Sequence, residues 1–273
     1  MKKIILILLL TLPVYTQVVN SVKITPFINF GSYNNNSSSA SFSFYSSLNL
    51  FNYDYLSLGF DQLKIDNQHW EYEQSTYVAG YTSNFYPFYL SFNYGYVAGD
   101  YTAKLFPLVY SDDINIYNGK ITYNTDLVFL SGSFSHLNIR GIKRLISNQT
   151  EGAVIFVPSV KLSFGLSVLS TNQDDGRDLL GTEIFASYRN DLDLVFTGKV
   201  FLGERAYYFS PALFTIFNQN ETQKGNYKLQ VDYLINNLLT ASGVYQHSVF
   251  DGYRIDYFSI GLSYLINTSP STD

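Results

Sequence analysis

The chain has 273 residues, of which 46% are hydrophobic, 18% aromatic and only 14% charged. A soluble domain usually has about 25% charged residues, so much of this exterior is expected not to face water. The absence of cysteine excludes disulfides, thiolate metal sites, a cysteine nucleophile and a lipoprotein anchor. A formal net charge of −5, without a basic run, argues against nucleic acid as a partner.

The first 21 residues have the plan of a secretory signal peptide. Met1-Lys2-Lys3 is positively charged, residues 4–12 are apolar, and small residues follow Pro13, so cleavage is expected near residues 16–21. The alternative, an uncleaved membrane helix, needs about 20 apolar residues, and this apolar run is too short. The mature chain is therefore expected to cross the inner membrane without being held there.

After Ser21 the dominant pattern is an alternation of apolar and polar residues, which predicts strands with one apolar and one polar face. The alternation is clearest in Val22–Phe30, Ser41–Leu50, Val160–Val168, Tyr227–Ile235 and Phe258–Ile266. Between such runs lie clusters of Asn, Asp and Gly, residues that tolerate the positive φ angles of hairpin turns. The least clear segments are Tyr101–Asn118 and Leu137–Asn148, and no segment has a convincing helical period.

The composition of the two strand faces predicts a membrane barrel. The second face is rich in Ser, Gly, Asn, Gln and Tyr, which suits a wet or hydrogen-bonded interior behind an apolar face in lipid. Aromatic residues near strand ends suit girdles at the membrane interfaces, as at Phe85, Tyr86, Tyr94, Tyr96, Tyr207, Tyr208 and Tyr257. We therefore expect an all-β, antiparallel up-and-down transmembrane barrel over residues 22–267, with about 12 strands in a range of roughly 10–14. The alternative is a secreted soluble β-sandwich.

The last predicted strand carries a recognisable motif. Ser259, Gly261, Tyr264 and Ile266 occupy the polar, glycine, aromatic and final apolar positions of a strand that resembles the C-terminal β-signal of bacterial outer-membrane β-barrel proteins. The resemblance implies delivery to the barrel-assembly machinery of a Gram-negative outer membrane. The polar tail, residues 268–273, departs from the family pattern, in which the chain often ends on an aromatic residue. In size alone the chain is similar to YaiO-type envelope barrels.

Catalytic and metal-binding residues are not expected. None of His69, His136 and His247 has a metal-ligand partner at helix or strand spacing. His247-Ser248 near Asp251 has the residue types of a lipid hydrolase, but adjacent strand residues point to opposite faces. We therefore predict no enzyme activity, no cofactor and no metal, with a lipid-modifying enzyme as the least favoured alternative.

Charged residues on the polar strand phase are the candidate lumen-facing groups: Lys23, Asp61, Lys161, Glu183, Asp193, Lys199, Lys228 and Asp232. They indicate either an ion-paired plug or a weakly selective pore. The favoured function is a small porin-like pore or export conduit, and the alternative is a non-conducting anchor or adhesion barrel. Expected partners are outer-membrane lipid and the assembly machinery, with small solutes or polysaccharide as candidate cargo.

Overall fold

The computed structural model describes residues 19–50, 54–106, 108–141, 144–210, 215–217 and 221–268. The predicted leader lies outside these residues except for its last three positions, and most of the predicted C-terminal tail also lies outside them. Among the described residues, no helix is long and apolar enough to span a membrane.

The described chain forms sixteen strands. They are β1 (Val19–Tyr33), β2 (Ser38–Leu50), β3 (Tyr55–Asp66), β4 (Trp70–Phe85), β5 (Phe88–Ala103), β6 (Val109–Asn124), β7 (Val128–Arg140), β8 (Leu145–Ser159), β9 (Leu162–Gln173), β10 (Asp178–Arg189), β11 (Leu194–Arg205), β12 (Tyr208–Ser210), β13 (Thr215–Phe217), β14 (Gln223–Leu234), β15 (Leu239–Phe250) and β16 (Arg254–Asn267).

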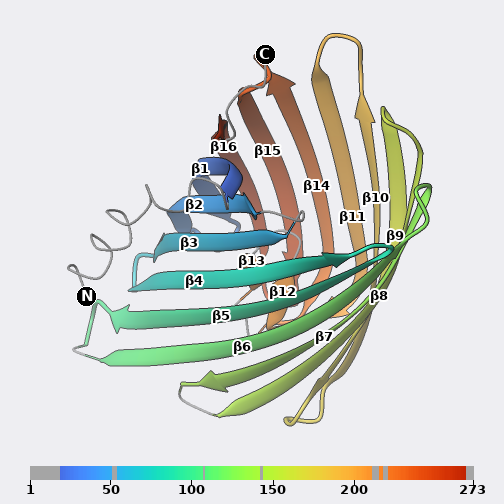
Figure 1. The fold of residues 1–273 in the computed structure, drawn as a ribbon. Coiled ribbons are helices and arrows are strands. Elements are labelled where there is room, and N and C mark those ends of the chain that lie inside the picture. Colours follow the sequence, from blue (N-terminus) through green and yellow to red (C-terminus); the bar gives the residue numbers. More distant parts are fainter. Residues whose placement is uncertain are drawn as a thin grey trace.

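Fourteen of these strands close into a single barrel (Figure 1). Each pairs in antiparallel fashion with its neighbours in the chain, β14 follows β11, and β1 pairs with β16 to complete the ring. The two short strands β12 and β13 form a separate sheet within the connection from β11 to β14. The all-β barrel prediction is confirmed, with a strand count at the top of the expected range rather than the favoured twelve. A single closed sheet excludes the sandwich alternative.

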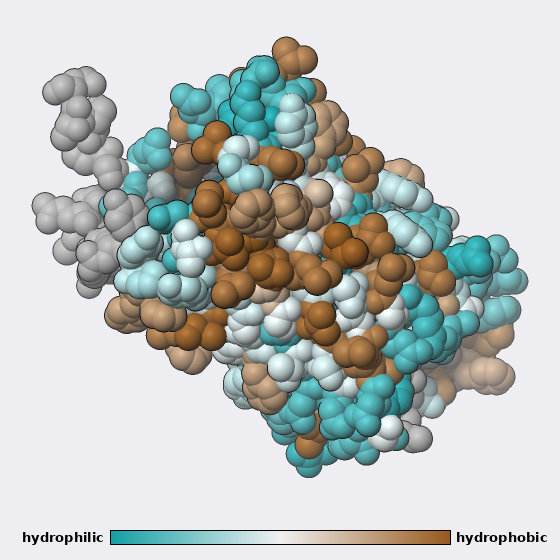
Figure 2. Space-filling model, turned by 90° about the vertical axis from the view of Figure 1, so that its right-hand side faces the viewer, coloured by the Kyte–Doolittle hydropathy of each residue, from teal (hydrophilic) through white to brown (hydrophobic). Residues whose placement is uncertain are grey.

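Along each strand the side chains alternate between the lumen and the outer surface. The outer surface exposes large apolar side chains, for example Phe92 at 67% and Ile260 at 71% exposure. On the face shown in Figure 2, apolar side chains gather across the middle, with hydrophilic ones toward the top and bottom. A water-soluble monomer rarely exposes a contiguous apolar patch larger than a few hundred Å². This band of exposed apolar side chains therefore has the character of a lipid-facing surface.

The two ends of the barrel are distinguished by the chain termini. We call the end where β1 begins and β16 ends the terminal end, and the opposite end the distal end. All distal connections are short, at 34–37, 67–69, 104–108, 141–144, 174–177 and 251–253, except the one at 206–222. The long polar loops expected for an adhesion barrel are therefore not present among these connections.

The lumen also differs between its two halves. Toward the terminal end, inward-facing side chains such as Ser57, Thr122 and Ser163 are only partly buried, so this half is open to water. Toward the distal end the inward side chains are buried in apolar clusters, including Val97, Leu137 and Phe201. The lumen is thus open toward the terminal end and packed with side chains toward the distal end.

Candidate functional site

The long distal connection supplies part of the distal packing. Instead of projecting from the barrel, the segment Ala206–Ser210, which we call the plug, has buried side chains at Ala206, Tyr208, Phe209 and Ser210. Its strand β12 pairs with β13, and both lie within the outline of the barrel (Figure 1). The plug therefore fills part of the distal half of the lumen from inside, and wall side chains around Tyr33 and Ile255 pack the rest.

Phe209 anchors the plug in an apolar cluster. Its side chain is fully buried. It packs with inward-facing residues of five consecutive strands, β4 to β8: Val78, Val97, Ile114, Ile116, Leu137, Ile139 and Leu145. Burial of a Phe side chain contributes about 1.5–3 kcal/mol by transfer from water. The Phe209 ring therefore supplies a large part of the free energy that holds the plug in place.

Two glutamines from the barrel wall bind the plug backbone. The Gln149 side-chain amide donates to the Phe209 carbonyl oxygen at 3.0 Å and accepts from the Phe209 N–H at 3.2 Å. Gln173 donates to the Ala206 carbonyl oxygen at 3.1 Å. These bonds replace the water that a plug backbone would otherwise need, since a buried backbone group without a partner is costly.

Arg205 holds the base of the plug. Its guanidinium lies over the rings of Phe201, at 3.9 Å, and Tyr208, at 4.3 Å, and its Nε donates to Gln223 Oε1 at 2.5 Å. The chain reaches this point through Gly203, whose φ of +114° and close approach to the β10 backbone exclude a Cβ. The register of β11 against β14 shifts here, which turns the chain into the lumen.

Beneath the plug lies a set of ionisable side chains that we call the lumen charge cluster. Its members are Lys120, Glu151, Glu183, Lys199, Lys228 and Asp232, all partly buried. Lys199 forms an ion pair with Glu183 at 3.0 Å, and Asp232 accepts from Ser242 at 2.6 Å and from Gln230 at 3.0 Å. Glu151 and Glu183 act electrostatically on both Arg205 and Tyr208, which places the cluster next to the plug base.

The structure therefore brings together four of the eight predicted lumen residues: Glu183, Lys199, Lys228 and Asp232. Asp61 also faces inward but belongs to another network on β1–β3, where it accepts from Ser43 at 2.5 Å. Lys23 has the inward phase of β1, and its exposed side chain lies at the terminal end of that strand.

Two of the predicted lumen residues are wrong. Lys161 precedes β9 and pairs with Asp191, and Asp193 precedes β11 and pairs with Arg189 at 2.6 Å. Both lie in terminal-end turns: β9 begins at Leu162, two residues after the predicted strand start at Val160, and β11 begins at Leu194, directly after Asp193. Sequence analysis also missed Lys120, Glu151 and Arg205. Lys120 could have been found, because it alternates with the polar residues Asn118 and Thr122 on one face of the predicted strand.

The hydrolase constellation does not assemble. Ser248 is fully buried in the lumen and accepts from Asn226 at 2.8 Å. His247 points outward, where its Nδ1 lies 2.8 Å from Asp256 Oδ1. His136 also points outward, with Nδ1 2.9 Å from Asn148 Oδ1, and the exposed His69 lies in a distal turn. The described residues include no group of three or more His, Cys, Asp or Glu that could hold a metal ion.

The residues that resemble the β-signal form the closing strand. Ser259 and Gly261 face the lumen on β16, and Tyr264 and Ile266 face outward. The aromatic girdle prediction is supported at Phe85 and Tyr86, which are 60% and 64% exposed at a terminal-end turn. It is wrong for Tyr208 and Tyr257, whose rings lie inside the barrel: Tyr208 on the plug and Tyr257 bonded to Tyr33.

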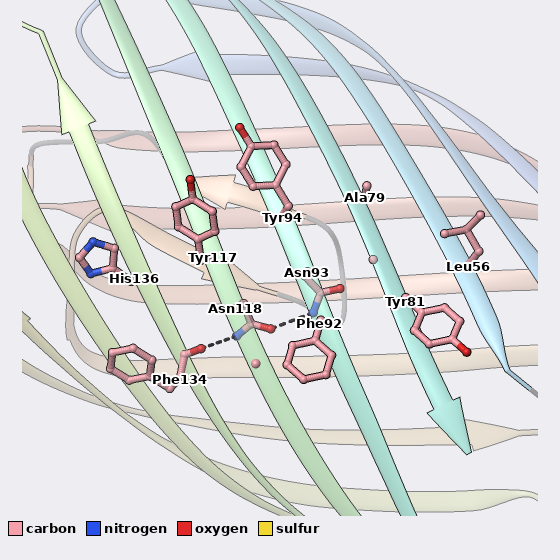
Figure 3. Close-up of a pocket in the computed structure, with 12 residues that line it drawn as sticks. Leu56, Ala79, Tyr81, Phe92, Asn93, Tyr94, Tyr117, Asn118, Phe134 and His136 are labelled. Carbon is pink, nitrogen blue, oxygen red and sulfur yellow. Dashed lines mark hydrogen bonds between the residues drawn. The ribbon is translucent and has the colours of Figure 1, made fainter. Parts of the chain in front are cut away.

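A groove of about 550 Å³ is hollowed in the outer wall over β3–β7 (Figure 3). Its rim is aromatic: Tyr94 lies beside Tyr117, and Phe92 and Phe134 lie on the two strands that flank Gly119. Asn118 bridges the strands beneath by accepting from Asn93 and donating to the Phe134 carbonyl oxygen. The groove faces the lipid side and has no charged lining residue, so it does not join the lumen charge cluster.

Comparisons with known proteins give a fold and no family. No family model matches the sequence, and no curated protein matches it. The chain is similar in structure to the Pseudomonas putida toluene transporter TodX, with 7% identity, TM-score 0.55, 91% of this chain and 90% of that chain covered. A deltaS2 mutant of the TodX monoaromatic hydrocarbon channel gives 9% identity and TM-score 0.57, with 90% and 89% covered. Pseudomonas aeruginosa OccK5 gives 9% identity and TM-score 0.46, with 92% and 98% covered.

Proposed function

We propose that the protein is a bacterial outer-membrane β-barrel that works as a gated transport conduit, with the plug as its gate. The even number of strands places both termini on one side, and we propose that this terminal end faces the periplasm. The distal end then faces the outside. The structural likeness to a toluene transporter and a hydrocarbon channel agrees with transport, although at such low identity it supports the fold alone.

One observation carries this proposal: a segment of a single connection, in addition to side chains of the wall, fills the distal part of the lumen. The plug is held by the buried Phe209 ring, by hydrogen bonds from Gln149 and Gln173, and by the stacking of Arg205 on Phe201 and Tyr208. These contacts can break without any change in strand pairing. A barrel that served only as an anchor would have no need for a half-lumen that is open at the terminal end, beneath a separate segment.

The alternative functions lack a comparable observation. An adhesion barrel uses extended outer loops, and the distal connections other than 206–222 are turns of a few residues. A lipid hydrolase would need a serine within reach of its histidine, and Ser248 and His247 are on opposite faces of β15. We propose that the protein has no enzyme activity.

The test is single-channel recording of the refolded mature protein in a planar bilayer. The wild type is compared with a plug-release variant that combines Gln149→Ala and Phe209→Ala. Heat-shifted gel mobility shows that each protein is folded. We expect a wild type that is closed for most of the time and a variant with frequent discrete conductance steps.

Two results would contradict the proposal. A folded plug-release variant without conductance steps would show that the lumen offers no path even when the plug is loosened. A wild type that conducts continuously, with the same step size as the variant, would show that the plug is not the gate.

A further inference from the structure

The groove of Figure 3 continues into a second hollow of the outer wall. This second hollow has a volume of about 410 Å³ and lies over β5–β8. Gly119 lines the first hollow and Ile121 lines the second, and the two are successive outward-facing residues of β6. The hollows therefore adjoin, and we call them together the outer furrow.

Glycine forms the floor of the outer furrow. Gly119, Gly132 and Gly152 lie on β6, β7 and β8, and Gly132 is the cross-strand partner of Gly152. A Cβ built at any of the three meets nothing within 4 Å, so packing of the wall does not require glycine there. Glycine inside a strand weakens the strand, and it often marks a place where a ligand approaches the backbone closely.

The furrow has polar groups at its distal end. Tyr94, Tyr117 and His136 form a cross-strand row there (Figure 3). Because His136 Nδ1 donates to Asn148 Oδ1, Nε2 of the neutral ring is an acceptor. The neighbouring Tyr117 hydroxyl can donate, so this end offers both a donor and an acceptor to a polar head group.

Toward the terminal end the furrow is lined by apolar and aromatic side chains. The successive outward rows are Phe92–Gly119–Phe134, Ile121–Gly132–Gly152 and Phe88–Tyr123–Leu130. From Tyr117 to Tyr123 the furrow follows six residues of β6, or about 20 Å at a rise of about 3.3 Å per residue. An acyl chain that reaches the middle of a bilayer spans about 15 Å, half of the hydrocarbon core, so one chain fits.

The position of the furrow favours a lipid over other ligands. It is continuous with the lipid-facing band of the wall and has no charged lining residue. Its ligand therefore comes from the membrane, and a polar end beside an apolar path matches the head and chain of a lipid. A second barrel, whose wall is convex, would rest on the aromatic rims, whereas a slender chain can reach the glycine floor.

We propose that the outer furrow binds one acyl chain of a glycerophospholipid, with the chain on the glycine floor and the head group at Tyr117 and His136. One lipid is then a bound partner of the barrel, distinct from the lipids that surround the rest of the wall. The inference rests on the lipid-facing wall and not on the plug. A plug-release variant that fails to conduct would overturn the transport proposal and leave this one unaffected.

The test is native mass spectrometry of the refolded mature protein in detergent, titrated with palmitoyl-oleoyl phosphatidylethanolamine. We expect one lipid adduct that saturates well before a second one forms. Gly119→Leu with Gly132→Leu fills the floor and should raise the dissociation constant of this adduct roughly tenfold or more, as expected when about two methylene groups lose their contact. Tyr117→Phe with His136→Phe removes the head-group contacts and should raise it by roughly threefold to tenfold.

The matched control is Gly198→Leu with Gly243→Leu. These glycines lie on the outer face of β11 and β15, also with open space for a Cβ, but outside the furrow. The dissociation constant should therefore stay unchanged. Heat-shifted gel mobility verifies the fold of every variant. If the floor variant does not fold, Phe92→Ala with Phe134→Ala removes the rim instead and should also weaken the adduct.

Two outcomes would overturn the lipid site. One is equal affinity in the wild type and the floor variant, or a wild type without a distinct first adduct. The other is a wild-type dimer that the floor substitutions dissociate, because a second copy of the chain would then occupy the furrow.

Discussion

The strongest prediction concerns Phe209, whose ring is fully buried where the plug meets the wall. Replacing a buried Phe by Ala typically costs about 3–5 kcal/mol. If the ring is solvated when the plug leaves, this cost falls on the closed state alone. Since about 1.4 kcal/mol is a tenfold change in an equilibrium constant, Phe209→Ala should raise the released population by roughly 10²-fold to a few thousandfold.

The absence of native cysteine makes this shift measurable. Ser147 is fully buried next to the plug, where Gln173 bonds both its Oγ and the Ala206 carbonyl oxygen. A Ser147→Cys reporter should react with a water-soluble maleimide only when the plug has moved away. When release is fast compared with the reaction, the labelling rate follows the released population. Phe209→Ala should therefore accelerate labelling by the same factor.

Phe134→Ala is the control for this experiment, because it removes the same atoms from the outer face, where the ring is 52% exposed. We expect it to leave the labelling rate nearly unchanged. Equal labelling rates in the reporter protein with and without Phe209→Ala would refute the assignment of the ring as the plug anchor. A comparable acceleration by Phe134→Ala would show that the reporter senses the whole barrel instead.

Three further predictions concern the barrel itself. Gly203→Ala should lower the free energy of unfolding, measured by urea denaturation, by about 1–3 kcal/mol, because its φ of +114° strains any residue with a Cβ. Gly198→Ala, whose added Cβ meets nothing within 4 Å, should change the free energy of unfolding little. Hydrogen bonds, first that from Tyr81, lower the pKa of Asp54, so its ionised form stabilises the fold above the ordinary aspartate pKa. Asp54→Asn should thus lower the urea midpoint at pH 7, and the difference should vanish as the pH falls through the folded-state pKa; a pH-independent difference would contradict this. Mass spectrometry of the mature protein should show leader cleavage before Val19, because that residue already pairs with β2, and a mature chain starting after residue 21 would disprove it.

The strands with apolar residues facing lipid could be predicted because their alternation keeps one phase from end to end. In Val160–Val168, the apolar residues that predicted an outer face do face outward, as at Phe164 and Leu166. The same logic located the polar lumen and the closing strand. It worked because a lipid belt and a wet interior impose opposite demands on successive residues.

The two unclear segments have a physical explanation. In Tyr101–Asn118, Ile114 and Ile116 face the plug and are fully buried, while Asn115 between them faces outward. Leu137 and His136 show the same inversion on β7. The polarity of these strands reverses toward the distal end, since the packed distal end needs an apolar interior. An alternation that changes phase within one strand has no consistent apolar face to detect.

The plug could not be predicted for a different reason. Its residues Tyr207, Tyr208 and Phe209 resemble an aromatic strand end, and nothing in their order distinguishes a girdle from an inward turn. The decision is made by contacts distant in sequence, such as that with Gln149, sixty residues earlier. Glycine at 203 was the one local signal, because its positive φ allows the inward bend.

The brevity of the distal turns has a consequence for the living cell. A bacterium that places this protein in its outer membrane would offer antibodies, phage tail fibres and host proteases little beyond turns such as 67–69 and 251–253. The one connection long enough to be recognised or cut is folded, in the part the structure describes, into the barrel's own interior. With the distal end facing outward as proposed, burial of the plug would also keep the described part of this connection away from the cell surface.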